Sequence, residues 1–249
     1  MSNRFGFALA LAPLFLVAGC GNGTGDGNAA ASTAPVAGAA APTGQKWEEV
    51  VIRTPEGGFR MGNPDAPLKL IEYGSRSCPH CAAFDAEGFP KLKEGPIASG
   101  KLSYEFRDFP VHGALDIGPI LLGQCVEPAL FFPMLDQMMS NQQALLAGTE
   151  KISQAEQASL QGKSPNDVAA FLVEKLGYLD FVKQRGLPEA KARACVADKA
   201  ALDTLSKNLQ VADQKYQVNS TPTFILNGKA LAGVDNWETL KPALAPAGI

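Results

Sequence analysis

The stretch Ser75–Phe84, SRSCPHCAAF, carries two cysteines separated by two residues, Cys78 and Cys81. Cysteines at this spacing occur in metal sites, in structural disulfides and in redox couples. The spacing alone does not distinguish these three chemistries. The interpretation therefore depends on the rest of the chain.

Composition excludes several classes of protein. The chain has 249 residues, of which 46% are hydrophobic and 19% charged, as in globular proteins with a buried core. The formal net charge of -3 provides no broad basic surface, so we expect no nucleic-acid partner. Zinc usually takes four ligands, and Cys125, Cys195 and His112 do not form a second close pair. We therefore expect neither a metal nor another cofactor.

Residues 1–20, MSNRFGFALALAPLFLVAGC, are typical of a secretory signal. One early cation, Arg4, precedes the apolar run Phe5–Val17, which is too short for a comfortable membrane span. The last five residues, Leu16–Cys20, resemble the lipobox of bacterial lipoproteins, in which the cysteine is acylated and becomes the mature N-terminus. The resemblance implies that Cys20 carries lipid. Ordinary signal cleavage beside an incidental cysteine is the alternative.

Residues 21–46 consist mostly of Gly, Ala, Ser, Thr and Pro. Such a segment buries too little apolar surface to offset its ordering entropy, so we expect a disordered tether. The folded domain is expected to cover residues 47–249. We expect an exported, periplasm-facing protein that is attached to a membrane through its N-terminal lipid. Gly21 stands where an aspartate often marks inner-membrane lipoproteins, which favours the outer membrane.

The number of cysteines, together with the export signal, restricts how the central pair can be bonded. Disulfides persist outside the cytoplasm. If Cys20 carries lipid, four cysteines remain, and four allow three pairings. Adjacency favours Cys78 with Cys81, which leaves a structural disulfide between Cys125 and Cys195. Two separate buried thiols are the alternative for this second pair.

Hydrophobic periodicity predicts an α/β domain with a long helical segment. The expected strands cover residues 48–53, 68–73, 102–109, 223–226 and 229–232. A helix is expected from Pro79 to Lys93, and another of about ten residues after a capping box at 235–238. Residues 111–219 are expected to be helical almost throughout. The separate helical segments are 115–126, 129–141, 149–161, 165–176, 178–185 and 188–214.

This order of elements resembles the DsbA family of exported thiol-disulfide oxidoreductases over residues 48–247. A strand–loop–helix unit with CxxC and a final strand–strand–helix unit make up the thioredoxin arrangement. The resemblance implies an α/β thioredoxin fold with a large helical insertion at about residues 111–219. The motifs that carry it are Cys78-Pro79-His80-Cys81, Glu72, Asn63-Pro64-Asp65-Ala66-Pro67 and Thr221-Pro222.

The cysteine pair is expected at the start of a helix, where backbone amides and the helix dipole favour a thiolate at Cys78. Pro79 is well tolerated in a first helical turn. His80 can donate a hydrogen bond to the sulfur, and Cys81 is expected one turn further in and more buried. These features favour a redox couple in which Cys78 attacks. An inert disulfide is the alternative.

Two features outside the pair complete the expected site. The resemblance implies that Glu72 is a buried acid that moves the proton of Cys81, and the alternative is a surface glutamate at the sheet rim. It also implies that Pro222 follows a cis peptide bond and faces the cysteines, while the backbone of Thr221 binds substrate. A trans proline at the start of a strand is the alternative. His112 follows a strand end, and we assign it no role.

The expected protein is a monomeric, lipid-anchored oxidase that donates disulfides to exported cysteine-containing proteins. A membrane redox partner would reset its cysteine pair. Isomerases of the wider group dimerise through a separate N-terminal domain, and the segment before the first strand is too thin for one. A threonine before the proline nevertheless resembles the isomerases, so an isomerase or reductase stays open. A non-catalytic binding module with the same fold is the third alternative.

Overall fold

The computed structural model describes residues 34–249. The expected signal peptide, the lipidation site Cys20 and the tether up to residue 33 lie outside this range. Within the described range, no helix is both long and apolar enough to cross a membrane.

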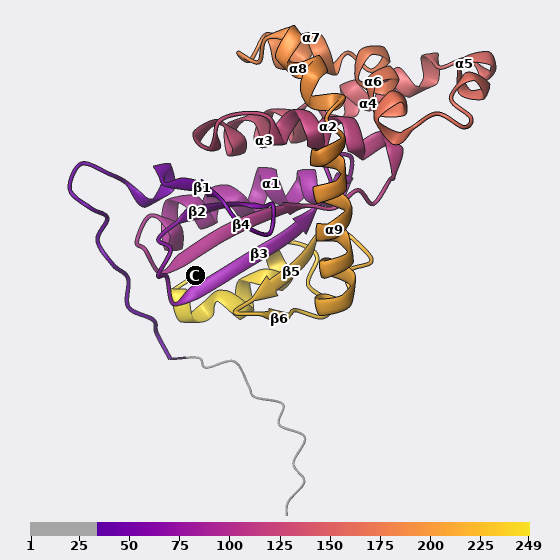
Figure 1. Ribbon diagram of the computed structural model, residues 1–249. Coiled ribbons are helices and arrows are strands. Elements are labelled where there is room, and N and C mark those ends of the chain that lie inside the picture. Colours follow the sequence, from indigo (N-terminus) through magenta and orange to yellow (C-terminus); the bar gives the residue numbers. More distant parts are fainter. Residues whose placement is uncertain (1–33) are drawn as a thin grey trace, which may run out of the picture. The chain divides into compact units, whose positions relative to one another are not determined.

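One sheet of six strands forms the centre of the part that the structure describes, in the order β1-β2-β4-β3-β5-β6 (Figure 1). β3 and β4 run parallel, and every other neighbouring pair is antiparallel. The register sets Glu72 of β3 between Phe106 of β4 and Phe224 of β5. The strands are β1 (Val51–Arg53), β2 (Phe59–Gly62), β3 (Leu68–Gly74), β4 (Leu102–Asp108), β5 (Thr223–Leu226) and β6 (Lys229–Ala230).

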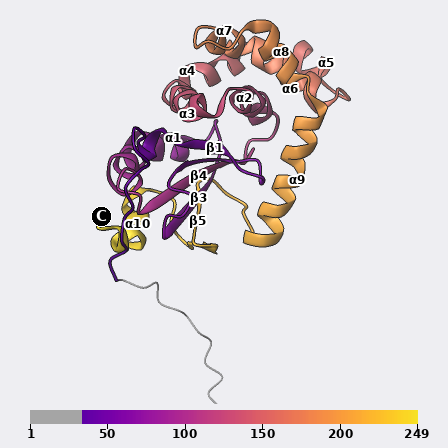
Figure 2. The same ribbon diagram turned by 60° about the vertical axis from the view of Figure 1, so that its left-hand side comes forward.

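Helix α1 (Pro79–Leu92) connects β3 to β4, as a parallel pair requires. The insertion follows β4 and lies above the sheet in Figure 1, and its last helix returns beside the sheet to β5 (Figures 1 and 2). Its helices are α2 (Ala114–Gln124), α3 (Phe131–Ser140), α4 (Gln142–Leu146), α5 (Gln154–Ser159), α6 (Pro165–Lys175), α7 (Tyr178–Lys183), α8 (Glu189–Val196) and α9 (Lys199–Tyr216). The chain ends in α10 (Trp237–Leu240) and a 3-10 segment, Lys241–Ala247.

Aromatic side chains join the insertion to the sheet and to α1. The rings of Phe59 and Phe131 stack with centroids 3.8 Å apart, and those of Phe89 and Phe132 stack at 5.5 Å. These four side chains belong to one continuous apolar core. The insertion therefore shares the core of the thioredoxin part, and the predicted fold class is confirmed.

Strand β2 is absent from the prediction. Its four residues are too few for a clear alternating pattern, and it is stabilised by pairing with β1 on one side and β4 on the other. Residues Trp47–Glu49 form a 3-10 turn, so only Val51–Arg53 of the expected first strand is extended. The pairing of β2 with β4 joins segments that are distant in sequence, which local periodicity does not register.

Two helical predictions differ from the structure for local reasons. The expected helix 188–214 is divided at Asp198, whose carboxylate caps α9 by accepting from the amides of Ala200 and Ala201. The final helix has four α-helical residues before it tightens into a 3-10 segment that contains two prolines. Its capping box joins Asn236 to Thr239.

The described part of the predicted tether, residues 34–46, contacts the domain. The amide of Val36 donates to the carbonyl of Pro246 at 2.9 Å, and the indole of Trp47 donates to the carbonyl of Ala39 at 2.7 Å. The side chain of Val36 packs against the main core. These residues therefore lie along the domain as a strap (residues 34–46) instead of extending away from it.

Candidate active site

The two central cysteines lie where β3 gives way to α1. Cys78 is the N-cap residue of α1 and Pro79 follows it in the first turn, where its missing amide hydrogen costs no helical hydrogen bond. Cys81 lies one turn further in. Both sulfurs are free thiols, and the residues are 4% and 0% exposed. Pro79 and His80 are exposed at the surface beside them.

The environment of Cys78 favours its thiolate. The pKa of Cys78 is lowered to about 5, first by a hydrogen bond from the Cys81 thiol. The backbone amides of Cys81 and His80 lower the pKa further, while burial opposes them. Within residues 34–249 the His80 imidazole makes no hydrogen bond to the sulfur, so His80 acts through its backbone amide.

Cys81 has the opposite environment. Burial raises its pKa well above the ordinary value, and the hydrogen bond to Cys78 and the negative charge of Glu72 raise it further. The amide of Ser75 donates to its sulfur at 3.4 Å and acts against this rise. Near neutral pH the pair therefore consists of a thiolate at Cys78 and a buried thiol at Cys81.

Glu72 is a buried carboxyl, 1% exposed, and it does not lie at an open rim of the sheet. The hydroxyl of Tyr104 donates to its Oε2 at 2.6 Å. Burial raises the pKa of Glu72 to about 8, although the hydrogen bond from Tyr104 opposes the rise. A carboxyl with this pKa exchanges protons near neutrality, and its charge acts on Cys81.

Thr221 lies beside Cys78, and Pro222 follows Thr221 in the chain. The peptide bond between them is cis, and Pro222 is buried. The Cys78 thiol donates to the carbonyl of Thr221 at 3.3 Å. The hydroxyl of Thr221 is buried without a hydrogen-bond partner in the described chain.

A polar network beside the pair was not predicted. The carboxylate of Asp116 accepts from the hydroxyl of Ser75 at 2.8 Å and from the amide of Ser77 at 3.1 Å through Oδ1. Its Oδ2 accepts from the amide of His112 at 2.9 Å. His112, to which no role was assigned, also places Nδ1 2.7 Å from the hydroxyl of Ser77. An acid in the first turn of an otherwise apolar helix is the one sequence signal that marks Asp116.

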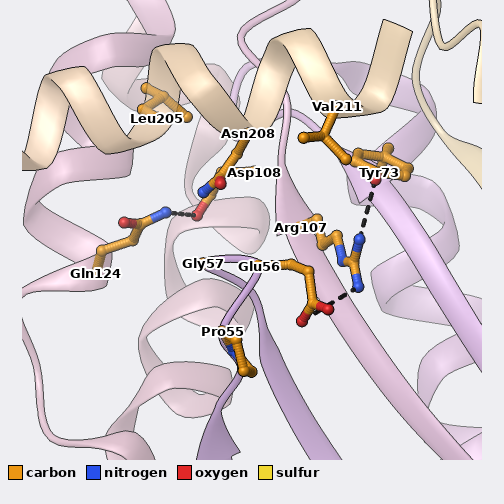
Figure 3. A pocket seen from close by; sticks show the side chains of 10 residues that line it. All are labelled: Pro55, Glu56, Gly57, Tyr73, Arg107, Asp108, Gln124, Leu205, Asn208 and Val211. Carbon is orange, nitrogen blue, oxygen red and sulfur yellow. Dashed lines mark hydrogen bonds and ion pairs between the residues drawn. The ribbon is translucent and has the colours of Figure 1, made fainter. Parts of the chain in front are cut away.

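A buried ion pair fixes the loop that carries the cysteines. Arg76 Nε lies 2.7 Å from Asp108 Oδ1, and the two side chains are 0% and 2% exposed. Asp108 Oδ2 also accepts from the side-chain amide of Gln124 at 3.1 Å, and Figure 3 shows this contact. The guanidinium of Arg76 lies over the ring of Phe131, 5.2 Å from its centroid.

The other predicted cysteines lie in the insertion. The sulfurs of Cys125, at the end of α2, and Cys195, in α8, are bonded to each other across 70 positions of sequence. No group of three or more His, Cys, Asp or Glu side chains in residues 34–249 is arranged to hold a metal ion.

A cavity of about 170 Å³ lies between the sheet and α9 (Figure 3). Arg107 reaches into it and contacts the hydroxyl of Tyr73 at 3.1 Å and Glu56 at 3.9 Å. Its Nε is paired with Glu105 at 2.7 Å. None of the predicted site residues lines this cavity. The one guanidinium in its lining, that of Arg107, is already paired with the carboxylate of Glu105.

The fold and this edge of the sheet define a thioredoxin-fold protein with a paired-cysteine site opposite a cis-proline. The family model described as Thioredoxin matches residues 54–245. The chain belongs to this family.

Curated relatives carry names from the same chemistry. A putative protein-disulfide oxidoreductase from Rickettsia bellii is 24% identical over 183 residues. The match covers 74% of this chain and 62% of that protein, so the chain spans less than two thirds of this relative. A probable disulfide bond formation protein D from Bacillus cereus is 27% identical over 190 residues, which cover 74% of this chain and 76% of that protein.

Solved structures share the fold. A protein-disulfide isomerase from Novosphingobium aromaticivorans superposes with a TM-score of 0.72 at 28% identity, covering 78% of this chain and 98% of that one. Wolbachia pipientis α-DsbA1 gives a TM-score of 0.55 at 22% identity, covering 76% and 90%. At 22% identity, the similarity to the Wolbachia structure shows a shared fold.

Proposed function

We propose that this chain is an exported thiol-disulfide oxidoreductase that donates disulfides to exported cysteine-containing proteins through Cys78 and Cys81. The observation that carries the proposal is the opposite environment of the two sulfurs. The pKa of Cys78 is lowered to about 5, and that of Cys81 is raised. A couple whose reduced form is stabilised as a thiolate is a strong oxidant.

The exchange starts with the pair oxidised. A substrate thiolate attacks the sulfur of Cys78, the bond between Cys78 and Cys81 breaks, and a mixed disulfide forms on Cys78. Cys81 leaves with the electron pair and takes a proton, for which Glu72 is the buried carrier. A second substrate thiolate then attacks the substrate sulfur, and Cys78 leaves as its stabilised thiolate. Two electrons pass from the substrate to the pair.

Substrate is expected to lie along the cis-proline. The carbonyl of Thr221 is within hydrogen-bond distance of Cys78, so a chain joined to that sulfur passes the backbone of Thr221. Pro222 lacks an amide hydrogen and is buried behind it. We assign substrate binding to these two residues, and proton transfer to Glu72.

The cellular setting is part of the same proposal. The apolar run and the LVAGC sequence support export with lipid on Cys20, periplasm-facing and attached to the outer membrane. A membrane redox partner would reoxidise the pair, and the chain would act as a monomer. The Cys125–Cys195 bond acts as a structural staple within the insertion at about residues 111–219.

A disulfide isomerase or reductase is the second candidate. Thr221 before the cis-proline resembles isomerases of the wider group, and the similar Novosphingobium structure is that of a protein-disulfide isomerase. Both activities use the same cysteine pair, so the direction of electron flow separates them.

The reduction potential of the Cys78/Cys81 couple, read against glutathione, tests the direction. We expect a potential well above the value of about -270 mV that is typical of thioredoxin, with the protein oxidised in the cell. A strongly reducing couple that is kept reduced contradicts the oxidase and supports the reductase.

Two variants test the remaining parts of the proposal, which are the role of Cys78 and the lipid anchor on Cys20. Cys78→Ser is expected to abolish disulfide transfer to a reduced, unfolded substrate, and unchanged function would support a non-catalytic binding module instead.

Cys20→Ser is expected to release the protein from the membrane fraction. A variant that stays membrane-bound contradicts the lipid anchor.

A further inference from the structure

The insertion reaches the backbone of the cysteine loop through one amide side chain. Gln142 is the first residue of α4 and is 7% exposed. Its Nε2 donates to the carbonyl of Arg76 at 3.1 Å and to the carbonyl of Cys78 at 3.0 Å. The two carbonyls flank Ser77, so one side chain spans the turn that leads into α1.

Each of these carbonyls depends on Gln142 in a different way. Arg76 is fully buried, and in the described chain Gln142 is the donor to its carbonyl. The carbonyl of Cys78 already accepts the first helical hydrogen bond of α1, from Ala82 at 3.1 Å. Gln142 is its second donor, so the peptide group after Cys78 is held from both sides.

Packing fixes the position of Gln142 relative to α1. It follows directly on α3, which contacts α1 through the stacked rings of Phe132 and Phe89. The side chain of Asn141 caps the junction by donating to the carbonyl of Gln137 at 2.8 Å. The amide of Gln142 is therefore presented by a rigid helix pair and not by a free loop.

The remaining contacts of the loop do not replace this one. Asp116, also from the insertion, binds the Ser75 hydroxyl and the Ser77 amide and leaves the carbonyls untouched. The ion pair with Asp108 holds the Arg76 side chain and not its backbone. The amide of Cys78 donates to the carbonyl of Ser75 at 3.3 Å within the loop itself. Among the residues that the structure describes, Gln142 is the donor from the insertion to the carbonyl of Cys78.

We propose that Gln142 is a positioning residue that holds the backbone of Cys78 where its sulfur meets the first amides of α1. The inference rests on the proposed redox function of the pair. The thiolate is stabilised by donors whose geometry depends on the Cys78 peptide group, because the amides of His80 and Cys81 belong to the same helical turn. The two hydrogen bonds from Gln142 are called the clamp below. Without them, the loop presents the sulfur to these donors less often.

Gln142→Met tests the clamp because methionine keeps the length and volume of the side chain but donates no hydrogen bond. The readout is the pH dependence of the alkylation rate of Cys78 in the reduced, full-length protein. We expect the midpoint to rise by about one pH unit, because a displaced Cys78 backbone weakens about one hydrogen bond between the first amides of α1 and the thiolate. The equilibrium with glutathione is expected to move about tenfold toward oxidised protein.

Gln143→Met is the matched control, since Gln143 is the exposed neighbour on the same helix. Its midpoint is expected to equal that of the wild type. A Gln142→Met protein that titrates like the wild type overturns the proposal. A wild-type midpoint near 8.5 contradicts the redox function instead, and the difference between wild type and variant still decides the clamp.

Two further measurements cover a variant that does not fold. Gln142→Leu also removes the donor and adds no charge, and we expect the same upward shift. In the wild-type protein the side-chain amide protons of Gln142 are expected to exchange slowly with solvent, because both acceptors are buried. Rapid exchange contradicts the clamp without any substitution.

Discussion

At the scale of single residues, the partner cysteine contributes most to the reactivity of Cys78. The largest cause of the lowered pKa of Cys78 is the hydrogen bond from the Cys81 thiol. Cys81→Ala is therefore expected to raise this pKa, and Cys81→Ser to raise it less, because a hydroxyl still donates. The pH dependence of Cys78 alkylation measures both. Equal midpoints for alanine and serine would show that the partner acts without a hydrogen bond.

Glu72 couples the site to stability. Its folded pKa of about 8 lies above the model value of 4.5, so between these pH values the folded protein keeps a proton that the unfolded chain has lost. Stability contributed by the neutral carboxyl is complete below about pH 4.5 and is lost as pH rises toward 8. Glu72→Gln is expected to remove this loss, with a gain on the order of a few kcal/mol at pH 8 and little change at pH 4.

Urea unfolding of the reduced protein at pH 4 and pH 8 measures this difference. Glu94→Gln, at an exposed position, is the control and is expected to show no such pH dependence. A Glu72→Gln protein whose stability changes equally at both pH values contradicts the buried, neutral carboxyl.

At the scale of elements, the sequence predicts what is local and misses what distant segments bring together. The cysteines, the proline in the first turn of α1 and Thr221-Pro222 are recognisable as motifs. Asp116 and Gln142 are not, because each meets the cysteine loop across 39 or more positions, through the packing of α2 and α3. No helical periodicity encodes that docking, so the supporting polar contacts appear only in the fold.

Gly123 shows how closely α2 approaches the buried ion pair. A Cβ built there lies 2.2 Å from Nη1 of Arg76, whose guanidinium is fully buried and held by Asp108. Alanine favours a helix over glycine by about 1 kcal/mol, but overpacking a core costs about 1–3 kcal/mol. We therefore expect Gly123→Ala to lower the free energy of unfolding.

Denaturant unfolding checks this expectation against Gly95→Ala, because a Cβ at Gly95 meets no atom within 4 Å. The control is expected to be neutral or slightly stabilising. A Gly123→Ala protein as stable as its control would mean that the guanidinium can move aside, and the buried ion pair would then not be rigid.

At the scale of the whole domain, the strap and the active site lie at opposite ends of the central strands. The cysteines follow the end of β3. The strap contacts the turn before β4, where a Cβ on Gly38 would lie 2.2 Å from the carbonyl of Ser99. β3 and β4 are parallel, so this turn lies at their other end. A chain held by its N-terminus would therefore leave the domain far from the sulfurs.

This separation predicts that the strap supports stability without tuning the thiolate. The half-buried side chain of Val36 packs on the core, so Val36→Asp places a charge against apolar side chains and is expected to lower the free energy of unfolding by about 1–2 kcal/mol. The alkylation midpoint of Cys78 is expected to stay where it is, because the amide of Val36 bonds to Pro246 and not to the cysteine loop. Ala37→Asp, at an exposed neighbour, is the control for an added charge. Thermal unfolding and the alkylation profile of both variants decide the matter: a shifted midpoint in Val36→Asp alone would mean that the two ends of the sheet are coupled through its core.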